Sequence, residues 1–200
     1  MLIFYDLETT GLNQFHDKIT EFCFIKRGHG DIETFHHLVN PLKPIPAIVQ
    51  KITQITPELV KNEPTFDHFA QEIINFITSS RVDYPDEPIF LVAHNNDGFD
   101  QLVLNAHLKS CGITLKDYNL HFIDSLLLSR KLHPEIPKHN LSALNKAFNL
   151  PWIQAHRADG DCNMLANVYN KLVENLAMFL GKSHMDLMTN PQQVYNWIYY

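Results

Sequence analysis

The sequence predicts an α/β domain built on a mixed five-stranded sheet flanked by helices. Short apolar runs divided by turn residues open the chain, as in an antiparallel strand meander, and later apolar strands alternate with amphipathic helices. The 200 residues contain no internal repeat and no low-complexity linker. Together these observations predict one domain, which is long enough to bury a core without disulfides.

The first three strands are expected near the N-terminus. Apolar and β-branched residues predict strands at Leu2–Leu7, Ile19–Lys26 and Thr34–Val39. Turn residues follow the first strand at Thr9–Gly11 and the second at Gly28–Asp31. This order predicts an antiparallel meander.

Helices and strands then alternate. Thr56 and Pro57 are of the types that begin a helix, as its cap and its first residue. Ile89–Ala93 is wholly apolar, which is typical of a strand covered on both faces. The elements expected after the meander are helices around Ile48–Ile55, from Thr56 and at Phe66–Ile77, a strand at Ile89–Ala93, a helix at Gln101–Lys109, a strand at Leu120–Ile123, and helices at Ser125–Leu132, from Asn140 and at Asp159–Leu180, the last ended by Gly181.

The charge of the chain is unevenly distributed. It carries 16 Lys and Arg against 22 Asp and Glu, a net charge of −6, which by itself argues against phosphate binding. Residues 101–157, however, hold seven basic and three acidic residues. This segment is either a solvated surface or a basic face for nucleic acid, and Lys138, His139 and Arg157 are its candidates for phosphate contacts.

Cysteine spacing and hydropathy exclude other classes of protein. The three cysteines, Cys23, Cys111 and Cys162, are too far apart for a CxxC metal site. No apolar run approaches the roughly 20 residues that a membrane span needs. The chain opens on a strand-like run, Met1–Phe4, rather than on a signal peptide. We therefore expect a cytoplasmic protein that does not enter a membrane.

Two acidic residues end the first expected strand. Asp6 and Glu8 are separated by one residue, so their side chains point to the same face of the sheet. Helices cover that face, where two neighbouring anions repel each other and each needs a partner. This pair, placed just before a Thr-Thr-Gly turn, favours a site for Mg²⁺ or Mn²⁺, ions that prefer oxygen ligands.

A second polar cluster, His94–Asp100, directly follows the apolar strand Ile89–Ala93. Asp97 precedes a glycine, and its simpler interpretation is that of a turn former. Asp100 opens the next helix and is either its cap or a functional acid placed by that helix.

A third cluster, His156–Asp161, stands at the start of the last long helix. Asp159 is expected to cap this helix, and Asp161 lies in its first turn, where the helix dipole favours an anion. Asp124, by contrast, is interpreted as the cap of a helix and not as a ligand.

Taken together, the three clusters resemble the motifs of the DEDDh 3′–5′ exonucleases, a DnaQ-like family with a ribonuclease H-like fold. The segment Phe4–Leu12 matches the first motif of that family almost letter for letter, and the resemblance covers about residues 2–180. Weaker landmarks of the family are Asn40-Pro41, Ile45-Pro46, Ile52–Thr56, Ile123–Leu126 and His139–Leu141 with Leu144.

The resemblance implies roles for individual residues. Asp6, Glu8, Asp100 and Asp161 would be catalytic metal ligands, and His156 would be the general base. The residues that would contact the terminal nucleotide are Leu7, Thr9, Thr10, Leu12, Ile52, Thr53 and Phe99.

The resemblance also implies a mechanism with two Mg²⁺ ions about 3.5–4 Å apart, for which Mn²⁺ would substitute. Asp6 would bridge the ions, Glu8 and Asp161 would hold the first, and Asp100 the second. His156 would accept the proton of the attacking water. The product would be a nucleoside 5′-monophosphate released from a 3′ end.

The sequence departs from the commonest family pattern at two positions. Thr53-Gln54 stands where many members have His-Gly, and three residues separate Asn95 from Phe99 where proofreading subunits have two. These features, with Asp159-Gly160-Asp161, resemble the three-prime repair exonuclease subgroup and favour single-stranded DNA over RNA. The expected partner is nucleic acid with a free 3′ end, and the oligomeric state stays open, a homodimer included.

Two other functions would use the same residues. An oligonucleotide or small-nucleotide phosphodiesterase would need the same site, whereas a non-catalytic nucleic-acid-binding module would not need four acids and a histidine. Residues 1–180 are expected to form the exonuclease domain and residues 181–200 a C-terminal extension. Its aromatic end, Val194–Tyr200, is expected to dock on the same domain rather than to form a partner surface.

Overall fold

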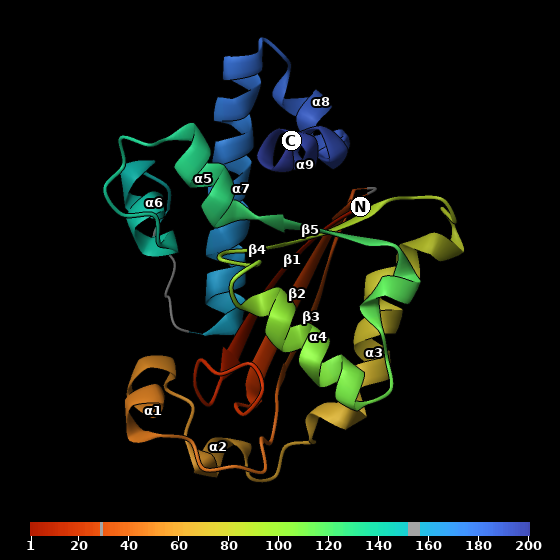
Figure 1. The fold of residues 1–200 in the computed structure, drawn as a ribbon, viewed down its shortest axis with the longest axis vertical. Coiled ribbons are helices and arrows are strands. Elements are labelled where there is room, and N and C mark those ends of the chain that lie inside the picture. The colour runs from red at the N-terminus through yellow and green to blue at the C-terminus, as the bar shows by residue number, and fades with distance from the viewer. Residues whose placement is uncertain (29, 152–156) are drawn as a thin grey trace.

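The computed structural model describes residues 1–28, 30–151 and 157–200. Its centre is a mixed five-stranded sheet in the order β3-β2-β1-β4-β5, with helices packed around it (Figure 1). The predicted α/β fold with a mixed five-stranded sheet is confirmed. In the part of the chain that is described, none of the helices combines the length and apolar character that crossing a membrane requires.

The strands occur in the predicted order. β1 pairs with β2 antiparallel and with β4 parallel, β2 pairs with β3 antiparallel, and β4 pairs with β5 parallel. An irregularity in the β1–β2 register falls directly after Glu8. The strands are β1 (Leu2–Thr9), β2 (Ile19–Gly28), β3 (Asp31–Leu38), β4 (Ile89–Ala93) and β5 (Leu120–Asp124).

Two of the helix caps that the sequence predicts are confirmed, and a third is wrong. The side chains of Thr56 and Asn140 accept backbone N–H groups of the helices that they precede, as predicted. The long helix α7 begins at Ala158, so its cap position is Arg157 and the prediction of Asp159 is wrong. The helices are α1 (Ala47–Thr53), α2 (Pro57–Val60), α3 (Phe66–Thr78), α4 (Asp100–Ser110), α5 (Ser125–Leu132), α6 (Leu141–Ala147), α7 (Ala158–Leu180), α8 (His184–Thr189) and α9 (Pro191–Tyr199), with short 3₁₀ turns η1 (Ser79–Val82) and η2 (Leu115–Tyr118).

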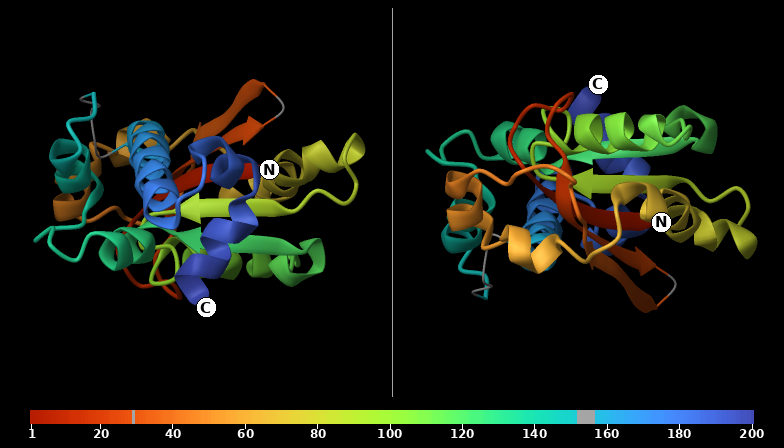
Figure 2. Two further views of the ribbon diagram at one scale, coloured as in Figure 1. Left: turned by 90° about the horizontal axis from the view of Figure 1, so that it is seen from above. Right: turned by 90° about the horizontal axis from the view of Figure 1, so that it is seen from below.

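The residues of β1 alternate between the two faces of the sheet. Phe4 packs in the core that α7 covers, where its ring contacts that of Tyr169. Tyr5 packs in the core on the opposite face, together with α3 and α4. Figure 2 shows helices on both sides of the strands. The alternation therefore directs Asp6 and Glu8 toward the face covered by α7.

Gln54, which stands where many members of the resembled family have glycine, lies at the end of α1. Gln54 follows this helix with a φ of 61°, in the left-handed region that glycine adopts most readily. Many members of the resembled family have glycine here. In this chain a glutamine takes this left-handed conformation.

The C-terminal helices pack on α7. Leu187 of α8 and Val194 and Ile198 of α9 are buried in the same core as α7. The hydroxyl of Tyr199 donates to the carboxylate of Asp97 at 3.1 Å, so the end of α9 reaches the loop that follows β4.

Candidate active site

Three of the predicted metal ligands meet between β1 and α7. Asp6 and Glu8 extend from the end of β1, and Asp161 lies in the first turn of α7. One carboxylate oxygen from each of the three lies within 4.8 Å of the others. They converge because β1 directs alternate side chains to the face that α7 covers.

Asp100 adjoins this cluster from the other side of β1. It is the first residue of α4 and is 5% exposed, while the cap position of that helix is Phe99. Asp100 is therefore not the helix cap, which was one of its two predicted roles. The backbone N–H of Leu7 bonds to its carboxylate, and its charge is, after burial, the largest cause of the raised pKa of Asp6.

The acids of the site repel one another. Burial and the neighbouring carboxylates raise the pKa of Asp6 well above its usual range, and burial raises that of Asp100. Burial, followed by the charges of Asp161 and Glu21, raises the pKa of Glu8 to about 8, against a smaller lowering by Arg157. Such a set of carboxylate oxygens fits a hard divalent cation, which would compensate the repulsion.

This repulsion predicts how stability depends on pH and metal. Between its ordinary pKa of 4.5 and about 8, Glu8 holds a proton in the folded chain that the unfolded chain releases. Raising the pH across this window should therefore destabilise the metal-free protein. Mg²⁺ must displace that proton, so the rise in Tm on adding Mg²⁺ should be larger at about pH 9 than at about pH 6, by about 2–4 °C for each kcal/mol of added binding free energy.

Thermal unfolding at both pH values, with Mg²⁺ and with a chelator, measures this difference. Glu8→Gln is the matched control for the metal-free protein, because an amide of the same shape does not titrate and should reduce the dependence of its Tm on pH, while Asp6 and Asp100, whose pKa values are also raised, keep the rest. A rise in Tm on adding Mg²⁺ that is the same at both pH values would contradict the expectation.

A cavity of about 560 Å³ opens beside the carboxylates. Glu8 forms part of its wall, so the cavity and the acidic cluster are continuous. Leu12 is 87% and Ile52 50% exposed, which leaves apolar surface free to contact a flat ring. All seven residues predicted to contact a nucleotide line the cavity: Leu7, Thr9, Thr10, Leu12, Ile52, Thr53 and Phe99.

Leu12 lies in the loop between β1 and β2, which hydrogen bonds and an ion pair of Asp17 stabilise. The carboxylate of Asp17 accepts the hydroxyl of Thr10 at 2.9 Å and the ammonium of Lys43 at 2.8 Å. A Cβ at Gly11 would lie 2.5 Å from an oxygen of Asp17, so a side chain at this position would displace the carboxylate. The loop therefore holds one side of the cavity in place.

Asp124 organises the loop that follows β4. Its carboxylate accepts the backbone N–H of Leu126 at 2.8 Å, which confirms its predicted role as a helix cap. The same carboxylate also accepts the backbone N–H groups of Asn95 and Asp97, at 3.0 and 3.2 Å. The sequence analysis did not foresee these bonds, which hold the segment leading to Asp100.

Two tyrosines reach the same loop. Tyr5 donates its hydroxyl to the side-chain oxygen of the fully buried Asn96. Tyr199 donates to Asp97 and accepts the backbone N–H of Asp124. The sequence analysis named Tyr199 only as part of the aromatic end Val194–Tyr200 and predicted neither hydrogen bond, although a buried tyrosine usually needs a partner for its hydroxyl.

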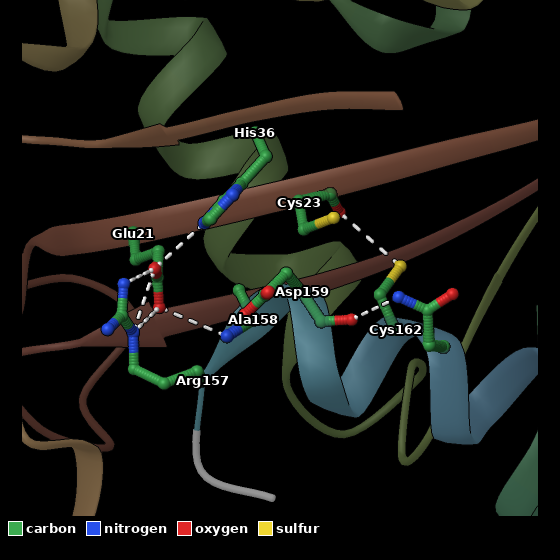
Figure 3. A network of polar contacts seen from close by, with 8 residues as sticks. Glu21, Cys23, His36, Arg157, Ala158, Asp159 and Cys162 are labelled. Atoms are coloured by element: carbon green, nitrogen blue, oxygen red, sulfur yellow. Dashed lines mark hydrogen bonds and ion pairs between the residues drawn. The ribbon is translucent and has the colours of Figure 1, made fainter. Parts of the chain in front are cut away.

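A buried ion pair holds the start of α7 against the sheet (Figure 3). Glu21 of β2 is fully buried and accepts Nε of Arg157 at 3.0 Å, Nη2 of Arg157 at 2.5 Å and the backbone N–H of Ala158 at 3.0 Å. Nε2 of His36 lies 2.8 Å from Glu21. Burial would raise the pKa of Glu21, but bonds from His36, Arg157 and Ala158 outweigh it and lower the pKa to about 2.

Sequence reasoning missed Glu21 and gave Arg157 a different partner. The guanidinium that was a candidate for phosphate contact donates to the buried carboxylate of Glu21. One signal in the sequence could have identified Glu21: it is an acid within the apolar run of β2. A charge buried in such a strand needs a partner. His156, the predicted general base, lies outside the described residues.

The sequence profile of a family described as Exonuclease (RNase_T) matches residues 3–169. The chain belongs to this family. The predicted membership in an exonuclease family is confirmed, and the three-prime repair subgroup stays a prediction. The cluster of Asp6, Glu8 and Asp161, which could hold a divalent metal ion, agrees with membership in this exonuclease family.

Curated relatives in the exonuclease family are much longer proteins. A DNA polymerase III PolC-type protein of Bacillus subtilis (strain 168) is 32% identical over 192 residues, which are 96% of this chain and 13% of the relative. The 3′–5′ exonuclease DinG of the same organism is 30% identical over 173 residues, 86% of this chain and 17% of the relative. The chain thus spans a small part of their length.

Solved structures share the fold. Exonuclease X, in complex with 5′-overhanging duplex DNA, is 28% identical with a TM-score of 0.63, and the match covers 87% of this chain and 92% of that one. Exonuclease I of E. coli, in complex with a dT13 oligonucleotide, is 22% identical with a TM-score of 0.75. That match covers 90% of this chain and 42% of the chain of exonuclease I. The second likeness concerns the fold alone.

Proposed function

We propose that this chain is a metal-dependent 3′–5′ exonuclease that releases nucleoside 5′-monophosphates from the 3′ ends of DNA. The observation that carries the proposal is the convergence of Asp6, Glu8 and Asp161 at the wall of an open cavity. Carboxylates grouped in this way hold the ions that hydrolyse phosphodiesters. Family membership supports the same reaction.

Each acid has a role in this proposal. Asp6, Glu8, Asp100 and Asp161 would hold two Mg²⁺ ions. When bound, the metal lowers the pKa of water and stabilises charge on the phosphate. His156 accepts the proton of the attacking water, since imidazole titrates close to neutral pH.

The cavity is proposed to take the terminal nucleotide. Leu12 and Ile52 offer apolar surface to its base, while Thr9 and Thr10 lie beside Glu8 at the start of the loop. Phe99 completes the wall next to Asp100. Residues 1–180 form the exonuclease domain, and residues 181–200 are an extension of it.

DNA is the proposed substrate class. The relative of similar length, exonuclease X, was solved with duplex DNA, and the PolC-type relative is a DNA polymerase by name. The spacing between Asn95 and Phe99 resembles the three-prime repair subgroup and favours DNA over RNA. We therefore expect single-stranded DNA to be shortened faster than RNA.

A matched panel of 5′-labelled DNA and RNA, single- and double-stranded, tests this proposal. With Mg²⁺ or Mn²⁺ we expect a ladder of products shortened from the 3′ end, together with nucleoside 5′-monophosphates. A chelator should stop the reaction. Binding without shortening under any divalent metal would instead indicate a non-catalytic nucleic-acid-binding module.

A length series separates the remaining alternative. A phosphodiesterase for small oligonucleotides would cleave chains of about two to five units and leave longer ones intact. An exonuclease shortens long chains continuously, so its rate on a long single strand should at least equal that on the shortest substrates.

A further inference from the structure

Glu21 and Arg157 form the most complete polar network that the proposed roles leave unexplained. We propose that Glu21 is a positioning residue for the metal site. It fixes the first turn of α7, and with it the carboxylate of Asp161, against the strand that carries Asp6 and Glu8. The inference rests on the proposed metal-dependent hydrolysis, because Glu21 acts through these ligands and not on substrate.

The first link in the argument is the pairing of β1 with β2. Glu8 and Glu21 are directly opposite each other in the antiparallel register. Residues opposite each other point to the same face and lie about 5 Å apart. Glu21 is thus the neighbour of a metal ligand on the face that α7 covers.

The second link is the start of α7. Glu21 bonds to the side chain of Arg157 and to the backbone N–H of Ala158 (Figure 3). The backbone N–H of Asp161 in turn donates to the carbonyl of Arg157 at 2.9 Å. The residues that Glu21 holds and the ligand Asp161 therefore belong to one hydrogen-bonded turn.

Among the residues that the structure describes near the start of α7, no side chain replaces this anchor. Arg157 occupies the cap position of α7, and its side chain makes no capping bond. Ala158 is fully buried, so its N–H would have no partner without Glu21. A strand distant in sequence thus supplies the acceptor that a local cap provides in other helices.

The pair also keeps Glu21 from acting as a ligand itself. Ligand atoms of Glu21, His36 and Asp159 lie within 4.8 Å of one another, like those of a metal site. Four donors nevertheless already bond to Glu21: Nε and Nη2 of Arg157, Nε2 of His36 and the N–H of Ala158. The guanidinium of Arg157 therefore supplies the positive charge beside Glu21 that a metal ion would otherwise supply.

Mn²⁺ binding by Glu21→Gln tests the proposal independently of activity. Glutamine keeps the shape and an acceptor oxygen but removes the charge that holds Arg157. We expect the Kd for Mn²⁺, followed by the electron paramagnetic resonance signal of the free ion, to rise by about 10–100-fold. Turnover should fall at low metal concentration and recover at saturating metal, with the KM for DNA unchanged. Because bound metal would also stabilise a weakened fold, the Tm of the metal-free Glu21→Gln protein is measured alongside and should stay close to that of the unchanged protein.

Further variants make the result interpretable. Arg157→Lys keeps the charge but not the two-nitrogen contact, and we expect it to weaken Mn²⁺ binding in the same direction. The double variant Glu21→Gln with Arg157→Gln should raise the Kd for Mn²⁺ no more than Glu21→Gln alone, because the single change already breaks the ion pair. Lys171→Gln is the matched control, since it removes the exposed pair with Glu174 on the same helix and should change nothing.

Two outcomes overturn the inference. The first is a folded Glu21→Gln protein that binds Mn²⁺ as the unchanged protein does. The second, which applies if Glu21→Gln does not fold, is unchanged Mn²⁺ binding by Arg157→Lys. An unchanged protein that binds Mn²⁺ but hydrolyses no nucleic acid would refute the proposed function instead, and the comparison of affinities would still test the role of Glu21.

Discussion

Replacing Asp161 by asparagine is expected to lower turnover on single-stranded DNA by about 10³-fold and to weaken Mn²⁺ binding. The amide has the shape of the carboxylate but lacks the charge that offsets a divalent ion. Asp161 is also the proposed ligand that α7 brings to the two acids of β1, so its loss would open one side of the cluster. Product formation from a 5′-labelled strand and Mn²⁺ titration measure the two effects.

Asp159→Asn is the matched control for this change. Asp159 lies in the same first turn of α7 and is exposed, so both substitutions remove one negative charge from the same helix end. Both therefore lose a similar favourable interaction with the helix dipole. Nearly equal losses of turnover in the two variants would show that the dipole, and not ligation by Asp161, accounts for the effect.

Much of the site could be predicted because its signals are local. The spacing of Asp6 and Glu8 fixes them on one face of a strand whatever the rest of the fold does. Asp124 precedes a helix, and its cap bond to Leu126 follows from its residue type and position. These inferences needed no knowledge of which strands pair.

The remaining part depends on contacts between residues far apart in sequence. Local capping rules favoured Asp159 at the start of α7, but the acceptor for Ala158 is Glu21, 137 residues earlier. The sequence reveals an acid in an apolar strand, yet not its partner, because that depends on strand register and on how α7 crosses the sheet. The bond of Tyr199 to Asp97, 102 residues apart, was out of reach for the same reason.

This division also explains which residues a motif can identify. Asp6, Glu8, Asp100 and Asp161 stand in the short patterns by which the sequence resembles the exonuclease family. Glu21 and Tyr199 lie outside those patterns, and their contacts depend on the three-dimensional fold. Their roles emerge from hydrogen bonds and burial.

His156→Ala is expected to lower turnover by about 10²–10⁴-fold while Mn²⁺ binding stays unchanged. The reason is the proposed division of roles, in which His156 accepts a proton and the four acids hold the ions. This pattern differs from that of Asp161→Asn, which should lose both activity and metal. Added imidazole should restore part of the activity of His156→Ala, because a free base can enter the space that the side chain leaves.

His68→Ala provides the control for general effects of removing a histidine. His68 is exposed on α3, which packs on the face of the sheet opposite the carboxylates. Replacing His68 by alanine should therefore leave turnover unchanged. Near-full activity of His156→Ala would refute the base assignment and leave the metal site standing. Loss of Mn²⁺ binding in His156→Ala would refute it too, since the histidine would then contribute to metal binding rather than to proton transfer alone.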